Sequence, residues 1–141
     1  PVNDEPGQKI FLEKMICELG LTKHVELLGF QSDTKKFLKK ASIFLLPSWS
    51  EGHPNSILEA MSVGTPVIAS NVGGISETIK NGFNGFIFEP YDVGGFARKI
   101  IQLTDDEENK KSIINNSLKI LKRKYKIQNK VKELEKIYDS I

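Results

Sequence analysis

The sequence predicts an α/β fold, in which a parallel sheet carries helices on both faces. Two observations predict it. First, short apolar segments that end in turn residues alternate along the chain with segments whose apolar residues recur at helical spacing. Second, SIFLLPS (residues 42–48) is a continuous apolar run ended by Pro47, as expected of a strand covered on both faces. From its 141 residues, 39% of them hydrophobic, we expect one domain that buries most of its apolar surface.

The first predicted elements are a helix, a short strand and a second helix. Residues 8–19 carry apolar side chains at helical spacing, and Gly20 follows where a helix would end. VELLGF (residues 25–30) is typical of a short strand that leads into a glycine turn. Residues 33–41 are predicted to be helical, with Asp33 as the N-cap.

From residue 42 onward, strands and helices alternate. Strands are predicted at residues 42–48, 65–70 and 85–90, and helices at residues 54–63, 75–80 and from about residue 92. Pro54 suits the first turn of its helix, and Gly64 ends that helix. Gly94 and Gly95 each cost a helix about 0.5–1 kcal/mol relative to alanine, so we expect the helix near residue 92 to start late or fray.

The C-terminal part of the chain is predicted to be helical from Leu103 to its end. The last helix has a single apolar stripe, formed by Ile127, Val131, Leu134 and Tyr138. This stripe can pack on the helix's own domain or dock against a neighbouring domain.

The composition limits the function classes. A net charge of +2 is too small to indicate nucleic-acid binding. Cys17 is the only cysteine, so the chain forms no internal disulfide or cysteine-based zinc site, which favours a reducing compartment. No segment approaches the roughly 20 apolar residues that span a bilayer. The chain opens PVNDEPG, without an initiator Met or a signal peptide. We expect a cytoplasmic protein or an excised cytoplasmic piece, with a peripheral membrane contact left open.

Two glutamates mark the candidate site. Ligands of parallel α/β sheets bind beyond the carboxyl ends of the strands, where residues 49–53 form a loop containing Glu51. Gly52 allows close main-chain approach, and the free amides after Pro54 suit an anion such as a diphosphate. Glu59 lies about 7–8 Å further along this helix and tilts back toward its start.

The surroundings of Glu59 add to the same hypothesis. Glu59 stands in an apolar run, where a charge needs a partner. Carboxylates accept paired hydrogen bonds from neighbouring hydroxyls, such as those of sugars and ribose. A molecule with hydroxyls at both ends and a diphosphate between them fits both acids and the helix start. That molecule is a nucleotide-sugar.

The same stretch resembles a known family. PSWSEGHPNSILEAMSVGTPVIASNVGGISETIKNGFNGFIFEP (residues 47–90) is similar to the donor-binding half of retaining glycosyltransferases of family 4, which have the GT-B fold. The shared pattern is P-S-x-x-E-G-x-P-x-x-x-L-E-A-M, then G-G-x-x-E-x-I and N-G-x-x-G. The resemblance extends from about Gly7 to Asp92. It implies a Rossmann-like domain, the C-terminal half of a GT-B enzyme, ending in long helices.

The resemblance implies a role for each acid. In the family the first glutamate contacts hydroxyls of the transferred sugar, and this position is Glu51. The second binds the ribose hydroxyls, and this position is Glu59. A solvated loop acid and an exposed helix residue without a role are the alternatives. The resemblance also implies that the main chain of the loop and helix start contacts the sugar and diphosphate. The residues concerned are Gly52, His53, Pro54, Asn55 and Ser56.

The remaining positions are open to two explanations each. His53 is at a variable position and is a bystander or a donor-specificity contact. Phe30 and Gln31 are candidates for base contact, although Phe30 also suits a core. Gly73 and Gly74 end a strand near the cleft in the family, but a tight turn explains them equally well.

The resemblance also implies an incomplete enzyme. Relatives hold the donor phosphates with an Arg and a Lys from the first strand and following helix of this domain, and we expect the given sequence to begin after these two residues. A whole enzyme also has an N-terminal domain that supplies the acceptor, so this chain is expected to be the C-terminal, donor-binding domain. Its expected partners are a nucleotide-sugar and, through the other domain, an acceptor glycan or lipid-linked glycan.

The implied reaction transfers a sugar from a nucleoside diphosphate to an acceptor hydroxyl with retention, in polysaccharide, lipopolysaccharide or glycolipid synthesis. The sequence lacks D-x-D, so we expect neither metal nor cofactor. Glycoside hydrolysis by two carboxylates is one alternative, although it leaves the anion-ready helix start without a purpose. A non-catalytic nucleotide-sugar-binding module, or a donor subunit that needs a partner chain, is the other. The sequence leaves the base, sugar and acceptor undetermined.

Overall fold

The structure is a computed structural model that describes residues 6–52 and 54–125. The chain divides into two compact units, one up to Ser32 and one from Asp33 onward. The prediction of a single domain over residues 1–141 therefore stays a prediction. The predicted apolar stripe at residues 127–138 lies outside the described residues.

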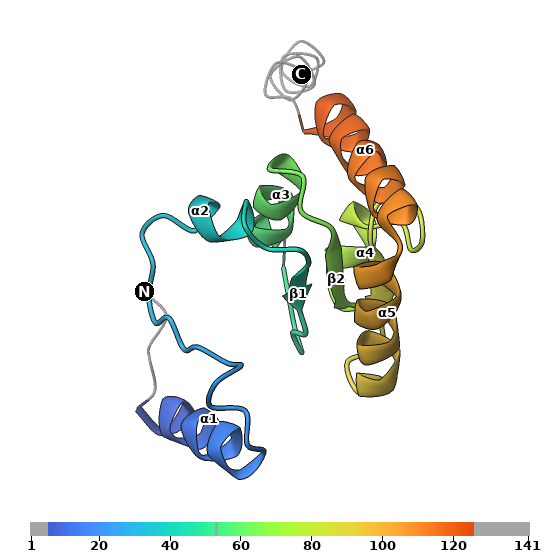
Figure 1. Ribbon diagram of the computed structural model, residues 1–141. Helices are drawn as coiled ribbons and strands as arrows, with labels where there is room; N and C mark the ends of the chain where they lie inside the picture. Colours follow the sequence, from blue (N-terminus) through green and yellow to red (C-terminus); the bar gives the residue numbers. More distant parts are fainter. Residues whose placement is uncertain (1–5, 53, 126–141) are drawn as a thin grey trace, which may run out of the picture. The chain divides into compact units, whose positions relative to one another are not determined.

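The first unit contains helix α1 (Pro6–Glu18) and the segment that follows it (Figure 1). Gly20 has a φ of 68° and ends the helix region as predicted, with the Leu21 amide donating to the Ile16 carbonyl oxygen at 2.9 Å. The strand predicted at residues 25–30 is wrong, since these residues pair with no strand in the described chain. The pattern of that segment was apolar enough for a strand, but a strand also needs a pairing partner.

The second unit contains one parallel sheet with the order β1-β2-β3. The strands are β1 (Phe44–Leu46), β2 (Val67–Ser70) and β3 (Phe86–Phe88). The helices of this unit are α2 (Lys35–Leu38), α3 (Asn55–Ser62), α4 (Ile75–Thr78), α5 (Val93–Asp105) and α6 (Glu107–Lys124). The predicted order of strands and helices from residue 42 onward is confirmed.

Helices cover both faces of β2. Val67 and Ala69 pack in one cluster with buried residues of α3 and α4. Ile68 packs in the other cluster with Phe96 of α5 and Ile113 of α6. Because side chains alternate along a strand, the two clusters lie on opposite faces, as Figure 1 shows for α3 and α5. The α/β class with helices on both faces is confirmed.

Two local expectations near β1 are wrong. β1 is an edge strand of the sheet that the described residues form, and the Leu45 side chain is 41% exposed, so β1 is not covered on both faces there. Thr34, not Asp33, is the N-cap residue of α2. An apolar run alone does not distinguish a central strand from an edge strand, because the pattern does not say which neighbours pair.

The predicted late start of α5 is also wrong. The Gly95 amide donates to Asp92 Oδ1 at 2.8 Å, which caps the helix from its first residue, Val93. A Cβ at Gly95 would lie 2.1 Å from Asp92 Oδ2 and 2.8 Å from the Phe88 ring. Glycine is therefore required here by close packing, and its conformational cost does not delay the helix.

The NGFNG segment that contributed to the resemblance has a structural role. Asn84 is fully buried, donates to the Thr78 carbonyl oxygen at 3.0 Å and accepts from the Lys80 amide at 2.7 Å. Ser117 of α6 donates to the Asn84 carbonyl oxygen at 2.7 Å. These bonds attach α6 to the turn before β3, so this part of the pattern belongs to the scaffold.

Candidate functional site

The loops that follow β1 and β2 meet at the carboxyl edge of the sheet. The Gly74 amide donates to the Gly52 carbonyl oxygen at 3.1 Å. Gly73 has a φ of 51°, and a Cβ at this position would lie 1.7 Å from the Glu51 carbonyl oxygen. Only glycine satisfies both the backbone angle and the contact. Gly73 and Gly74 thus contact and support the loop that carries Glu51. This role goes beyond that of glycines in an ordinary tight turn.

Glu51 is fixed by a neighbouring hydroxyl. Its side chain is half-buried, and Ser48 Oγ donates to Glu51 Oε1 at 2.7 Å. A carboxylate has about four acceptor sites, so this bond leaves capacity for a ligand hydroxyl. Glu51 therefore combines restricted motion with free acceptor capacity.

Helix α3 begins without a side-chain cap. Pro54 is the buried N-cap residue, with φ −76° and ψ 95°, and is not in the first turn as predicted. Ile57 donates to the Pro54 carbonyl oxygen at 3.1 Å, whereas no described residue accepts from the Asn55 or Ser56 amide. Unsatisfied amides and the helix dipole favour an anion at this point. His53 lies outside the described residues.

Glu59 lies on the outer face of α3. Ile57, Ala60 and Met61 are fully buried, whereas Glu59 is exposed. The expectation of an apolar environment around Glu59 is therefore wrong, because the helical period turns this residue away from its apolar sequence neighbours. Thr34 Oγ1 donates to Glu59 Oε2 at 3.2 Å. Exposure leaves the second oxygen open to a ligand.

Phe30 and Gln31 belong to the first unit. Phe30 is 88% exposed and is therefore not a core residue within this unit, and Gln31 Nε2 donates to the Leu28 carbonyl oxygen at 2.8 Å. A hollow of about 370 Å³ in the same unit is lined by Gln8, Lys9, Leu12 and residues 26–29. None of the predicted site residues lines it.

Sequence reasoning missed several side chains near the site. Ser48 stands three residues before Glu51, a spacing at which a loop hydroxyl reaches a carboxylate, so a local signal existed. Thr34 is 25 positions from Glu59, and no sequence pattern connects them. Trp49 and Tyr91, which follow β1 and β3, form an exposed T-shaped pair with ring centroids 4.6 Å apart.

The described part of the chain contains neither a metal cluster nor a membrane helix. Within residues 6–52 and 54–125, no three His, Cys, Asp or Glu side chains are grouped as a metal site. Over the same residues, no helix combines the length and the apolar character needed to cross a bilayer.

Comparison with known proteins gives consistent results. The model of the family described as "Glycosyl transferases group 1" matches residues 4–120. The UDP-Gal:alpha-D-GlcNAc-diphosphoundecaprenol alpha-1,3-galactosyltransferase of Escherichia coli is 38% identical over 117 residues, which are 79% of this chain and 30% of that enzyme. The capsular polysaccharide biosynthesis glycosyltransferase CapM of Staphylococcus aureus is 35% identical over 83% of this chain and 31% of that protein.

A solved structure agrees with these relatives. The crystal structure of Anabaena Alr3699/HepE in complex with UDP matches with a TM-score of 0.92 and 26% identity, over 99% of this chain and 39% of that chain. A second structure of the same protein contains UDP-glucose. The match confirms the Rossmann-like α/β class of a GT-B half. The chain spans about a third of the length of the curated relatives it matches.

Proposed function

The chain belongs to the glycosyl transferases group 1 family, and on this premise we propose that it binds the nucleoside-diphosphate sugar from which a glycosyltransferase takes its sugar. The observation that carries the proposal is the start of α3. The Asn55 and Ser56 amides have no described acceptor, and α3 follows the loop that places Glu51 against Gly73 and Gly74. A diphosphate meets the amides, and sugar hydroxyls meet Glu51.

The proposed division of roles follows from position. Glu51 precedes the amides and contacts the transferred sugar, whereas Glu59 lies further along α3 and contacts the ribose. In the transfer step the bond between the anomeric carbon and the diphosphate oxygen breaks, the acceptor hydroxyl oxygen bonds to that carbon, and the hydroxyl proton passes to the departing diphosphate. The α3 amides stabilise the departing diphosphate, and Glu51 orients the positively charged sugar. We propose that the configuration is retained and that no metal takes part.

The remaining parts of the proposal concern the whole protein. The Escherichia coli relative is named for a diphosphoundecaprenol-linked substrate and the Staphylococcus relative for capsular polysaccharide. By analogy we place this chain in polysaccharide or glycolipid synthesis at the cytoplasmic face of a membrane, with the acceptor held by a second domain. The chain alone is then expected to bind donor weakly and to transfer no sugar. Transfer by the chain without any partner would contradict this.

Calorimetry with UDP, GDP and ADP and their glucose esters tests the site. Glu59→Ala should lower the affinity for the nucleotide and for its sugar ester by the same factor, about tenfold, because both ligands contain ribose. Glu51→Ala should spare the free nucleotide and weaken only the ester. Glu108→Ala, which removes an exposed acid from α6, is the matched control and should change neither. Unchanged binding in Glu59→Ala would contradict the ribose role, and equal loss of both ligands in Glu51→Ala would contradict the sugar role.

A further inference from the structure

The two glutamates share a feature that the resemblance does not assign. Each has one carboxylate oxygen bound by the hydroxyl of a residue outside the predicted site. Ser48 Oγ donates to Glu51 Oε1 at 2.7 Å, and Thr34 Oγ1 donates to Glu59 Oε2 at 3.2 Å. In both pairs the second oxygen of the acid has no described donor. The two acids come from a loop and a helix, so the repetition does not follow from one local motif.

The Ser48 bond restrains a flexible side chain. A glutamate has three rotatable side-chain bonds, and a ligand that must order them loses affinity. Ser48 lies two residues after the end of β1, is half-buried and stands three residues before Glu51. Its hydroxyl holds one oxygen of Glu51 before any ligand arrives. The Glu51 side chain is therefore ordered in advance.

The Thr34 bond departs from the usual use of a helix-start hydroxyl. Thr34 is the N-cap residue of α2, where threonine normally accepts from an amide of the first turn. Its side chain makes no such cap bond and instead donates to Glu59 of α3. Local preferences are most often given up at functional sites. The start of α2 thus contributes to the placement of Glu59.

We propose that Ser48 and Thr34 are positioning residues, each of which holds one oxygen of a ligand-binding acid and leaves the other for a hydroxyl of the nucleotide-sugar. The proposal rests on the proposed function and assigns each hydroxyl to one end of the ligand. Ser48 acts on the sugar end through Glu51. Thr34 acts on the ribose end through Glu59.

The test compares two ligands on the full chain. Calorimetry measures UDP and UDP-glucose with wild type, Ser48→Ala and Thr34→Ala. Ser48→Ala should raise the Kd of UDP-glucose about threefold to tenfold and leave that of UDP unchanged. Thr34→Ala should raise both by the same factor, about threefold, because its bond is longer and exposed. Ser48→Thr and Thr34→Ser keep the hydroxyl and should restore wild-type values.

Matched controls remove hydroxyls that do not reach the carboxylates. Ser50→Ala alters the same loop as Ser48. Ser62→Ala alters the same helix as Glu59, where Ser62 Oγ donates only to the Glu59 carbonyl oxygen at 2.7 Å. Both should bind both ligands as wild type does. If Ser48 had a purely structural role, Ser48→Ala would lower the affinities for UDP and UDP-glucose by the same factor. This result would overturn the Ser48 assignment.

The outcomes separate this inference from the function on which it rests. If Glu51→Ala and Glu59→Ala show the expected losses while Ser48→Ala and Thr34→Ala match their controls, the positioning roles are wrong and the function stands. If wild type binds neither these ligands nor the GDP and ADP pairs, the proposed function fails and the positioning roles fail with it.

Discussion

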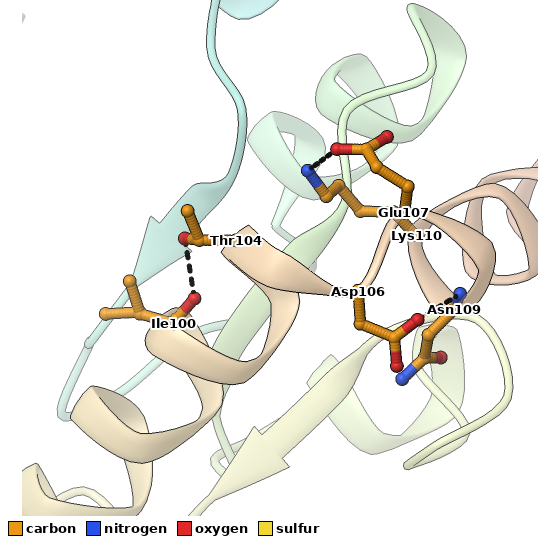
Figure 2. Close-up of polar contacts among 6 residues, drawn as sticks. All are labelled: Ile100, Thr104, Asp106, Glu107, Asn109 and Lys110. Carbon is orange, nitrogen blue, oxygen red and sulfur yellow. Dashed lines mark hydrogen bonds and ion pairs between the residues drawn. The ribbon is translucent and has the colours of Figure 1, made fainter.

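Helices α5 and α6 start differently from α3. Asp92 caps α5 by accepting from the Gly95 amide at 2.8 Å, and Asp106 caps α6 by accepting from the Asn109 amide at 2.9 Å. Figure 2 shows the second of these caps, where the chain passes from α5 to α6. α3 starts at Pro54, which has no side-chain acceptor to offer. A cap contributes about 0.5–2 kcal/mol, and α3 lacks this contribution.

The first turns differ in charge as well. α6 has Glu107 and Glu108 in its first turn, which complement the helix dipole, whereas α3 has no acid there. An acid at the start of α3 would repel a diphosphate and compete for its amides. The described side chains thus cap α5 and α6 but not α3, which agrees with the proposal that the α3 amides bind a ligand.

The largest loss of stability and affinity is expected from Gly73→Ala, because the added methyl group would collide with the loop before α3. The added Cβ would lie 1.7 Å from the Glu51 carbonyl oxygen at a φ of 51°, so the loop must move. We expect a loss of about 3 kcal/mol in the free energy of unfolding and more than about tenfold in UDP-glucose affinity. Thermal unfolding and calorimetry measure the two losses.

Gly82→Ala is the matched control for this substitution. Gly82 has a φ of 75°, but a Cβ added there would meet no atom within 4 Å other than those of its immediate chain neighbours. It should lose only about 1–2 kcal/mol of stability, from the backbone angle alone, and bind UDP-glucose normally. Equal effects of the two substitutions would show that the Glu51 contact has no importance.

The next effect is expected from Pro54→Asp, which gives α3 the cap that α5 and α6 have. The new carboxylate would accept from the first-turn amides and repel phosphate, so UDP affinity should fall about tenfold. Pro54→Ala removes the buried ring without adding an acceptor and separates packing loss from competition. Calorimetry with UDP should show a larger loss for aspartate than for alanine. Equal affinities would argue against an anion at these amides.

The sequence predicts the second unit well because its local signals agree with its packing. Pro54 and Gly64 are predicted to mark the ends of one helix. In the structure Pro54 is the N-cap residue of α3, and Gly64, with a φ of 82°, follows the C-cap residue Val63. The failures depend on distant partners. Residues 25–30 have the composition of a strand but no strand to pair with in the described chain, and the exposure of Leu45 depends on which residues cover its face of β1.

The site is predictable only in part for the same reason. The motif predicts Glu51 and Glu59 as site residues, and their roles stay predictions. The expectation that Glu59 is surrounded by apolar residues fails because its neighbours in sequence face the other side of α3. The contact between Gly73 and Glu51 joins loops from two different strands, and a sequence pattern does not specify such a contact. The Thr34 hydroxyl is likewise brought to Glu59 only by the packing of two helices.

A smaller effect is expected from Asp92→Ala, which makes α5 resemble α3. The Gly95 amide loses its acceptor, so the free energy of unfolding should fall by about 1 kcal/mol. UDP and UDP-glucose should bind normally, since the change lies outside the proposed site. Asp92→Asn keeps a good cap and should recover most of the stability in thermal unfolding. A loss of ligand affinity in Asp92→Ala would mean that the start of α5 also serves the ligand.

The smallest effect is expected from acid titration of the α6 start. A side-chain hydrogen bond from Lys110, aided by the Lys110 and Lys111 charges, lowers the pKa of Glu107 (Figure 2). A lowered pKa in the folded state gives stability that is present above the unfolded pKa and lost as pH falls through the folded pKa. The carboxyl NMR shift of Glu107 should show a titration midpoint at lower pH than that of an ordinary glutamate. Lys110→Ala should raise this midpoint toward the ordinary value. Because Glu107 is exposed, added salt should reduce the difference between the midpoints of wild type and Lys110→Ala. An unchanged midpoint in Lys110→Ala would show that this ion pair does not lower the pKa of Glu107 and does not stabilise α6.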